Sequence, residues 1–333
     1  MKLAMLGLGR MGANMTRRLL RAGHECVVFD RNAAVAASLA SEGAAAAFTL
    51  DELARALPQP RILWLMVPAG GVDELIAELR PHLAPGDIVI DGGNSNYRDT
   101  VRRAAALRAI GLHLVDAGTS GGIWGLEHGF CLMLGGEREV VDGLEPLLRT
   151  LAPGSQTVPS TPGVHLDPSV EHGYLYCGPS GAGHFVKMVH NGIEYGLMAA
   201  YAEGMNLLAR ARGSAPAQAE GEPNAPILAP DLKLADIAEL WRRGSVVRSW
   251  LLDLAARALN ADPELDNYSG RVADSGEGRW TIQAGIDAGV PLPVLAAALF
   301  SRFASRGESE FADKLLSALR HEFGGHREPP VRA

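Results

Sequence analysis

The sequence predicts two domains of different class. Residues 1–178 are expected to form an α/β domain with a doubly wound parallel sheet, and residues 179–333 an all-α domain. Two observations carry this expectation. Apolar, strand-like runs alternate with helix-like segments through the first half of the chain, a pattern typical of a parallel sheet with helices on both faces. In the second half, the periodic segments have the spacing of helices.

The first element is an apolar strand over residues 2–6, which leads directly into Gly7-Leu8-Gly9-Arg10-Met11-Gly12, and residues 13–20 then have a helical composition. Glycines in such a turn let the backbone approach a pyrophosphate, which the free N–H groups of the following helix can hold. A GxGxxG motif alone is weak evidence. With a strand before it and a helix after it, the motif predicts a Rossmann-type dinucleotide site.

A second apolar strand over residues 26–29 ends at Asp30. Asp30 follows the glycines at about the spacing of the acidic residue that binds the ribose hydroxyls of a dinucleotide. Its carboxylate would repel a 2′-phosphate, so NAD is the expected cofactor. NADP stays possible because the neighbouring Arg31 could pair with that phosphate.

Each of the next three strands is followed by a polar, glycine-rich loop. The carboxyl ends of parallel strands meet at one edge of a sheet, so these loops are expected to converge on a ligand. Any one loop could be ordinary turn chemistry, whereas three favour a site in which backbone N–H groups and Ser120 hold a carboxylate. The strands are 62–67, 88–90 and 113–115, the loops are 67–70, 91–95 and 118–122, and the helices between them are 72–79 and 96–109.

The second domain begins with the run GHFVKMVHNGIEYG at residues 183–196. On a helix with about 100° per residue, five of its polar side chains fall within an arc of about 140°. A solvated helix face is the alternative, but such faces favour Lys and Glu at a spacing of four residues, and Gly192 and Gly196 indicate close packing. A buried site is therefore expected at Lys187, His190, Asn191, Glu194 and Tyr195.

Helices are expected throughout the rest of the second domain, and two segments rich in Pro, Gly, Ser and Ala are expected to be surface loops without an assigned function. The helices are 200–211, 234–243, 249–259, 280–288, 292–304 and 310–323, and the loops are 155–172 and 211–230.

Composition argues against several classes of function. A net charge of −7 and a pI near 5.8 disfavour nucleic acid or an anionic membrane as a partner. No apolar run approaches the roughly 18 residues of a membrane span, and the N-terminal run is too short for a signal peptide, so a cytoplasmic protein is expected. The three cysteines form no CxxC or Cys/His pattern, so neither disulfides nor a metal site is expected.

Four motifs together, at residues 7–12, 91–95, 120–122 and 183–196, resemble the 6-phosphogluconate dehydrogenase family of decarboxylating enzymes. The resemblance covers nearly the whole chain and is to the short bacterial form, in which the helical domain is present once rather than duplicated. It implies that Lys187 is the general base and Glu194 the general acid. The implied substrate contacts are Asn94, Ser120, Gly121, Gly122, His190, Asn191, Tyr195 and Arg302, with Arg320 and His326 supplied by the tail of a neighbouring subunit. The implied cofactor contacts are Gly7, Leu8, Gly9, Arg10, Met11, Gly12, Asp30, Arg31, Val67, Pro68, Ala69 and Asn94.

The resemblance also implies a reaction: oxidative decarboxylation of 6-phosphogluconate, a phosphorylated sugar acid, to ribulose 5-phosphate and CO2 in the pentose phosphate pathway. Hydride would pass to NAD or NADP, and no metal would be required. Lys187 would take the hydroxyl proton as a neutral amine and then polarise the keto oxygen as an ammonium. Because a free lysine has a pKa near 10.4, burial or a cationic neighbour must lower it. The implied assembly is a homodimer or homotetramer with shared tails.

Three positions depart from the longer forms of the family. Pro68 stands where those forms have a lysine, and Ser275 and Glu277 replace a Lys/Thr pair, so a carboxylate would stand near the substrate phosphate. Two other functions stay open. One is a β-hydroxyacid dehydrogenase of the 3-hydroxyisobutyrate type acting on an unphosphorylated acid, and the tail pair argues against it. The other is a catalytically silent, cofactor-binding regulatory protein, and the presence of Lys187 and Glu194 argues against that.

Overall fold

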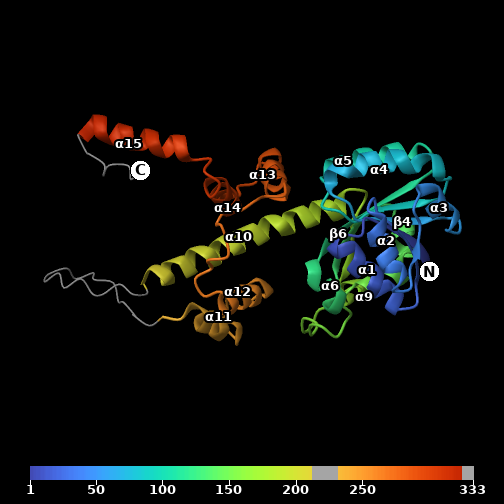
Figure 1. Cartoon of the computed structure of the whole chain (residues 1–333), viewed down its shortest axis with the longest axis horizontal. Coiled ribbons are helices and arrows are strands. Elements are labelled where there is room, and N and C mark those ends of the chain that lie inside the picture. The colour runs from blue at the N-terminus through green and yellow to red at the C-terminus, as the bar shows by residue number, and fades with distance from the viewer. Residues whose placement is uncertain (212–231, 325–333) are drawn as a thin grey trace. The chain divides into compact units, whose positions relative to one another are not determined.

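The computed structural model describes residues 1–211 and 232–324 (Figure 1). The chain divides into two compact units, Met1–His190 and Asn191–Ala333. The first unit is built on a sheet and the second is helical, as expected.

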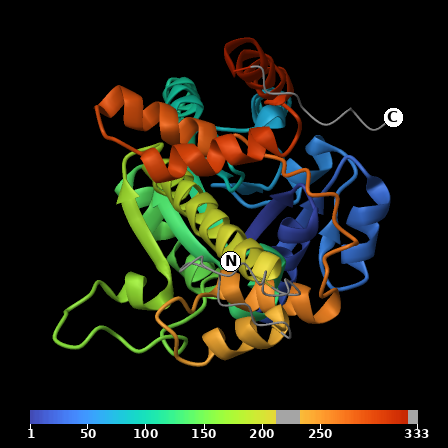
Figure 2. The same ribbon diagram turned by 90° about the vertical axis from the view of Figure 1, so that its left-hand side faces the viewer.

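The first unit contains one eight-stranded sheet with the order β3-β2-β1-β4-β5-β6-β7-β8. Strands β1 to β6 are mutually parallel, β7 runs antiparallel to β6, and β8 is parallel to β7. Figure 2 shows the strand colours passing from blue to green across the sheet. The strands are β1 Lys2–Leu6, β2 Glu25–Phe29, β3 Ala45–Ala46, β4 Ile62–Leu65, β5 Ile88–Asp91, β6 His113–Ser120, β7 Cys131–Gly135 and β8 Tyr174–Gly178.

The five strands that the sequence analysis expected are confirmed as β1, β2, β4, β5 and β6, all parallel. It did not predict β3, β7 and β8, and the antiparallel pairing of β7 with β6 departs from the parallel pattern. The segment between Ser120 and Cys131 holds only η3 Gly122–Trp124 and α6 Gly125–His128. A parallel crossover requires a dozen or more residues, usually with a full helix. This shorter connection returns the chain alongside β6 in the opposite direction.

Both faces of the sheet are covered by helices. Successive side chains of β1 accordingly pack into two different cores. Leu3 and Met5 belong to one core, and Ala4 and Leu6 to the other. The helices on the first face are α1 Arg10–Arg21, α2 Ala33–Ala40, α7 Arg138–Gly143 and α8 Glu145–Leu151. Those on the second face are α3 Leu50–Arg55, α4 Val72–Leu79 and α5 Tyr97–Arg108, and α4 and α5 are drawn in cyan in Figure 1. The doubly wound architecture is therefore confirmed.

Among the elements that the sequence analysis did not predict are three short helices in the connections. They are η1 Ala69–Gly71, η2 Arg80–His82 and α9 Pro168–His172. The expected loop 155–172 is therefore wrong over its last residues. Asp167 caps α9 by accepting the Ser169 N–H at 2.8 Å, and Pro168 occupies the first helical position. Asp followed by Pro is a helix-start signal that the loop composition concealed.

One long helix, α10 Ala182–Ala211, begins in the first unit and continues into the second. It was expected as two helices, 183–196 and 200–211, but the residues between them contain no helix breaker, and the chain stays helical. Residue 211 ends α10, and the rest of the expected loop 211–230 lies outside the described residues. The second unit also contains α11 Leu234–Arg242, α12 Trp250–Ala261, α13 Glu277–Ala288, α14 Pro293–Ala304 and α15 Glu310–Gly324.

In the second unit, α10 provides the surface on which two helix pairs pack. α11 and α12 form a small core against Tyr201 and Met205 of α10. Tyr195 packs with residues of α13 and α14. A Cβ on Gly192 would lie 2.8 Å from Thr281 Cγ2, and one on Gly196 3.2 Å from Leu295 Cδ2. The close packing expected at these two glycines is thus confirmed.

Candidate active site

The glycine turn after β1 is braced by the residue that ends β2. Gly7 has a φ of +90°, and a Cβ on Gly12 would overlap the Gly7 carbonyl oxygen, so both positions require glycine. Asp30 accepts the Leu8 N–H at 2.7 Å through one oxygen and the Asn32 N–H at 2.8 Å through the other. Asp30 therefore fixes the shape of the turn, a role that its sequence position did not reveal.

The other expected cofactor positions lie around this turn. Gly9 is the N-cap of α1 and has no side chain, so the N–H groups of the first turn, which holds Arg10 and Met11, remain available to an anion. A Cβ on Gly7 would lie 2.9 Å from Val67 Cγ1, so the end of β4 adjoins the turn. Pro68 and Ala69 follow directly, and Ala69 begins η1.

Arg31 is held by two carboxylates of α4. Its guanidinium lies 3.1 Å from Glu74 Oε2 and 3.5 Å from Glu78 Oε1. The hydrogen bond to Glu74 raises the pKa of Arg31. The residue that could have paired with a 2′-phosphate is therefore engaged elsewhere in the first unit.

The loop after β5 is organised by a buried carboxylate. Asp91, at the end of the strand, accepts the Gly93 N–H at 3.2 Å and the Ser95 hydroxyl at 2.7 Å. Arg103 of α5 lies 3.4 Å from the same carboxylate. These bonds hold the backbone on either side of Asn94, and the Asn94 side chain itself is exposed.

The first turns of α10 bring three of the expected site residues together. Lys187 is 6% exposed, and its Nζ lies 3.4 Å from His190 Nδ1. The other ring nitrogen, Nε2, lies 3.2 Å from Ser120 Oγ. A Cβ on Gly118 would overlap the Lys187 Cβ, so a glycine in β6 is what allows the lysine to pack there. Ser120, Lys187 and His190 form the reactive cluster of the first unit.

The loop after β6 has a backbone that requires glycine at two of the expected substrate positions. Gly121 has a φ of +141° and Gly122 a φ of +54°. Residues with side chains rarely adopt these values. The SGG motif is thus a conformational requirement of the turn that follows Ser120.

In the second unit, the expected phosphate-binding arginine lies on an aromatic ring. The Arg302 guanidinium stands 3.5 Å from the centroid of the Tyr195 ring, a cation–π contact. It also donates to the Ala273 carbonyl at 2.9 Å. The Tyr195 hydroxyl oxygen accepts the Ser275 N–H at 3.4 Å, which leaves the hydroxyl proton able to bind a ligand.

The two residues that depart from the longer forms lie beside this tyrosine. The Ser275 hydroxyl donates to Glu277 Oε2. Glu277 is 2% exposed, and within the described residues its other oxygen has no hydrogen-bond partner. Ser275 therefore has its only hydroxyl proton engaged, and it cannot donate that proton to a phosphate as well.

The segment that carries Ser275 is anchored by the preceding residue. Asp274 pairs with Arg279 at 2.8 Å and with Arg306 at 3.0 Å. Hydrogen bonds from Arg279 first and Arg306 next lower the pKa of Asp274 to about 2. A depressed carboxylate pKa stabilises the fold above the ordinary range of aspartate, and this contribution is lost as the pH falls toward 2.

The remaining expected residues are distributed along the helices of the second unit. Asn191 is buried and Glu194 is half-buried, both on α10. Arg320 lies exposed on α15, and His326 lies outside the described residues. The burial of Lys187, Asn191 and Tyr195 removes the alternative of a solvated helix face, since Phe185 and Ile193 on the other side are 40% and 51% exposed.

Two buried residues that the sequence analysis passed over connect the site loops to α10. Asp116 of β6 accepts the N–H groups of Gly181 and His184 at 2.7 and 2.9 Å. The His184 ring lies 2.7 Å from Thr100 Oγ1 and 3.1 Å from the Asp91 carbonyl oxygen. His184 lies inside the motif at residues 183–196, so the sequence could have identified it as a site residue. No sequence pattern connects Asp116 with Gly181, 65 residues later.

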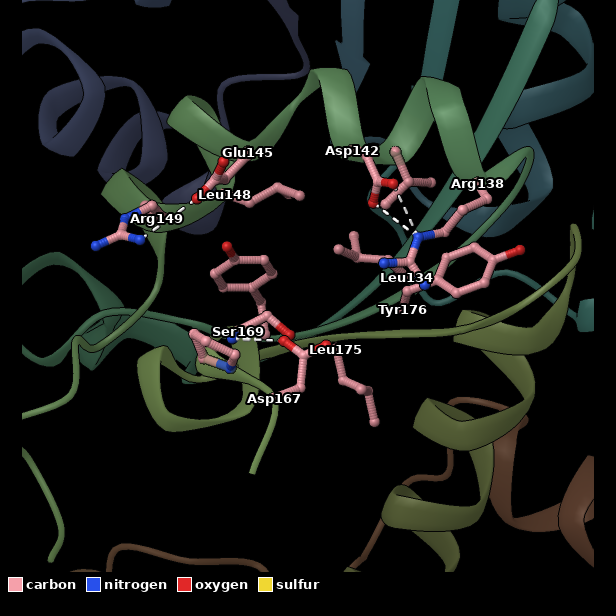
Figure 3. Close-up of a pocket in the computed structure, with 13 residues that line it drawn as sticks. Leu134, Arg138, Asp142, Glu145, Leu148, Arg149, Asp167, Ser169, Leu175 and Tyr176 are labelled. Carbon is pink, nitrogen blue, oxygen red and sulfur yellow. Dashed lines mark hydrogen bonds and ion pairs between the residues drawn. The ribbon is translucent and has the colours of Figure 1, made fainter. Parts of the chain in front are cut away.

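A separate pocket of about 300 Å³ lies between α7, α8, α9 and β8 (Figure 3). Its charged side chains pair with one another. Arg138 bonds Asp142 at 2.9 Å, and Arg149 bonds Glu145 at 3.3 Å. No expected site residue lines this pocket, and its arginines are already neutralised, so it is not a candidate for the anionic substrate.

The described part of the chain holds no cluster of three His, Cys, Asp or Glu side chains suited to a metal ion. Within residues 1–211 and 232–324, none of the helices combines the length and apolar character that crossing a membrane requires.

A glycine turn at the first βα junction, a buried lysine packed on β6 and a helical second unit define an oxidoreductase of the Rossmann-type dehydrogenase class. Residues 2–159 match the model of the NAD binding domain of 6-phosphogluconate dehydrogenase. Residues 183–221 and 229–327 match the model of the C-terminal domain of 6-phosphogluconate dehydrogenase. The chain belongs to the 6-phosphogluconate dehydrogenase family.

Individual relatives agree with the short form. An NAD(+)-dependent, decarboxylating 6-phosphogluconate dehydrogenase of Haloferax volcanii is 40% identical, with 98% of each chain covered. The structure of the Plasmodium falciparum 6-phosphogluconate dehydrogenase superposes with a TM-score of 0.75 at 25% identity, covering 100% of this chain and 67% of that one. A 3-hydroxyisobutyrate dehydrogenase of Salmonella typhimurium, with a TM-score of 0.68 and 24% identity over 90% of this chain and 91% of that one, shares the fold.

The glycine turn generates a prediction with two separable outcomes. Gly12→Ala should destabilise the first unit, because the added methyl overlaps the Gly7 carbonyl oxygen. Gly9→Ala should leave the free energy of unfolding within about 1 kcal/mol of the wild type, since nothing in the protein lies within 4 Å of the added atom. It should nevertheless weaken NAD binding at least tenfold, because the methyl would meet the pyrophosphate. Urea denaturation and NAD titration measure the two effects, and normal NAD binding by Gly9→Ala would place the pyrophosphate elsewhere.

Proposed function

We propose that this chain catalyses the oxidative decarboxylation of 6-phosphogluconate to ribulose 5-phosphate and CO2, with hydride transfer to NAD. The observation that carries the proposal is the buried Lys187 amine, 3.4 Å from His190 and packed on the strand that ends in Ser120. Membership of the family and the 40% identity to an NAD(+)-dependent, decarboxylating relative support the substrate and the acceptor.

Lys187 is the proposed base for the first step. As the neutral amine, Lys187 takes the proton from the substrate hydroxyl at the carbon β to the carboxylate. Bound NAD supplies the hydride acceptor. The Lys187 ammonium then stabilises the negative charge that develops on the keto oxygen as the bond to the carboxyl carbon breaks and CO2 leaves.

The enediol that remains needs a proton on the carbon that lost CO2. Glu194 lies seven residues after Lys187 on α10, two helical turns along, and is the proposed donor. Backbone N–H groups of Gly121 and Gly122 with the Ser120 hydroxyl are proposed to hold the substrate carboxylate.

The phosphate is proposed to bind the second unit. Arg302 stands over the Tyr195 ring, and the tyrosine hydroxyl proton is available. Guanidinium geometry suits a phosphate. Because Ser275 and Glu277 offer no donor, Arg320 and His326 of a partner subunit are proposed to complete the phosphate site.

An assay with purified protein tests the proposed reaction. Reduced nucleotide and CO2 should appear in equal amounts from 6-phosphogluconate, and neither should appear from 3-hydroxyisobutyrate. Turnover of 3-hydroxyisobutyrate without CO2 would establish the unphosphorylated β-hydroxyacid activity instead. NAD binding with no turnover of either acid would indicate a silent, cofactor-binding protein.

The role of Lys187 is tested by Lys187→Met, which keeps the length of the side chain without the amine. The variant should lose at least a thousandfold in kcat, because both proton transfer and charge stabilisation depend on the amine. Its NAD dissociation constant should stay within twofold of the wild type. Lys233→Met, at an exposed lysine of the second unit, is the matched control. Retention of a tenth of the wild-type kcat by Lys187→Met would remove the assignment.

NAD is the proposed preference, with NADP as a poorer acceptor. Asp30 stands at the end of β2 with its charge toward the glycine turn. Arg31, which follows Asp30 directly and could pair with a 2′-phosphate, is paired with Glu74 and Glu78. Both features disfavour NADP.

Release of Arg31 should therefore relax the preference. Exposed ion pairs contribute about 0 to 1 kcal/mol, so the double change Glu74→Gln, Glu78→Gln should raise kcat/KM for NADP by about two- to tenfold and leave that for NAD unchanged. Adding Arg31→Met should abolish the gain. No change with NADP in the double variant would mean that Arg31 does not face the ribose.

A homodimer or homotetramer is the proposed assembly, with tails shared between subunits. α15 has an apolar side that the rest of its unit leaves uncovered: Phe311 is 79% exposed and Leu316 is 61% exposed. Exposed apolar patches of this kind mark contact surfaces. The tail that carries His326 follows this helix directly.

Subunit mixing tests the shared site. Lys187→Met and His326→Ala should each be inactive alone. In a mixed dimer with shared tails, one site carries both lesions and the other carries neither, so about half the wild-type activity per mixed dimer should return. Native mass spectrometry would confirm that the subunits exchange. Demonstrated exchange without recovered activity would show that each tail serves its own subunit.

The domain boundary and the cellular context are also proposals. We place the functional boundary between residues 178 and 179, so that the whole of α10 belongs to the substrate-binding domain. The two family models leave residues 160–182 unmatched between them, which agrees with this choice. The proposed setting is the pentose phosphate pathway in the cytoplasm.

A further inference from the structure

We propose that Asp116 is a positioning residue of the active site: its carboxylate caps α10 from β6 and thereby sets where Lys187 stands. Asp116 is fully buried. Both of its oxygens accept backbone N–H groups from the start of α10, Gly181 at 2.7 Å and His184 at 2.9 Å. These belong to the N-cap residue and to the third residue of the helix.

The cap has to come from outside the helix because Gly181 cannot provide it. Its φ of +95° favours glycine, and a Cβ there would lie 2.8 Å from Val101 Cγ2 of α5. An ordinary N-cap side chain binds the N–H two or three residues on. Asp116 makes that bond, with the His184 N–H, across 68 residues of sequence, and its negative charge faces the positive end of the helix dipole.

The strand and helix approach so closely here that the cap controls position as well as stability. A Cβ on Gly183 would overlap the Met133 carbonyl oxygen, and one on Gly135 would lie 2.5 Å from Asp116 Oδ1. There is no spare space into which the helix start could settle if the carboxylate were lost. The helix would have to shift along or away from β6.

Such a shift would move the reactive cluster. On the same face of β6, the two residues that follow Asp116 at alternate positions are Gly118 and Ser120. Gly118 accommodates the Lys187 Cβ, and Ser120 contacts His190 at 3.2 Å. Asp116 thus sets the register of the two contacts that hold Lys187 in place.

The His184 ring extends the same anchor to the loop that carries Asn94. Its Nε2 lies 3.1 Å from the Asp91 carbonyl oxygen, so it donates there, and Nδ1 lies 2.7 Å from Thr100 Oγ1. A helix that slipped from Asp116 would also pull on the end of β5. Asp116 thereby aligns Lys187 with the loop that carries Asn94.

The test compares Asp116→Asn with the wild-type chain. Asn keeps the volume but presents an NH2 group to one of the two helix N–H groups. We expect kcat to fall at least tenfold, the NAD dissociation constant to stay within twofold, and amide hydrogen exchange over residues 181–190 to become at least tenfold faster. The kinetic part rests on the proposed function, whose failure would be seen in the wild-type chain before any variant is compared.

Asp87→Asn is the matched control. Asp87 is also fully buried and accepts backbone N–H groups, from Arg61 at 2.7 Å and Ala84 at 2.9 Å, but it precedes β5 at the end of the strand opposite to Asp91. The Asp87→Asn variant should be less stable than the wild type, with unchanged kcat and unchanged amide hydrogen exchange in α10. If Asp116→Asn does not fold, Gly135→Ala displaces the carboxylate instead and should give the same selective loss of kcat.

Three results would overturn the inference. One is a folded Asp116→Asn with kcat within twofold of the wild type. Another is a loss of NAD affinity as large as the loss of kcat, which would indicate general damage to the first unit. The third is unchanged exchange at the start of α10.

Discussion

The packing of the first turns of α10 on one face of β6 is the constraint on which the described site depends. Alternate residues of the strand, Asp116, Gly118 and Ser120, share that face. They meet helix residues spaced three apart, His184, Lys187 and His190. Two residues advance about 6.6 Å along a strand, whereas three residues advance about 4.5 Å along a helix. Facing residues of β6 and α10 can therefore stay paired only over the short distance in which the two elements cross. The chemistry is placed within that crossing.

Much of the fold could be predicted because five of the first six strands, β1, β2, β4, β5 and β6, are apolar and largely buried and are separated by helices. The last two strands could not, since their direction depends on a short connection after Ser120 rather than on periodicity. The single long α10 was missed for a related reason. The sequence analysis ended one helix at residue 196 and began another at residue 200, but nothing between them breaks a helix. Asp167-Pro168 carried a helix-start signal that the surrounding loop composition obscured.

For the site, the sequence located the candidate ligand-binding residues better than the residues that hold them in place. Lys187, Ser120 and His190 come together as expected. The partners that fix them do so through tertiary contacts that no local pattern encodes. Asp116 caps a helix that begins 65 residues later, and Arg31 pairs with α4. The sequence indicated the position of Asp30 after β2, but it did not indicate the hydrogen bond that Asp30 accepts from the glycine turn.

The central claim is that this packing places the Lys187 amine where it acts as the base. A crystal structure with NAD and 6-phosphogluconate bound tests it most directly, through the distance from Lys187 Nζ to the substrate hydroxyl oxygen β to the carboxylate. The account predicts a hydrogen bond of about 3 Å, with the substrate carboxylate against Ser120 and the following glycines. A bound substrate whose hydroxyl lies beyond reach of Lys187, with another side chain in its place, would contradict the account.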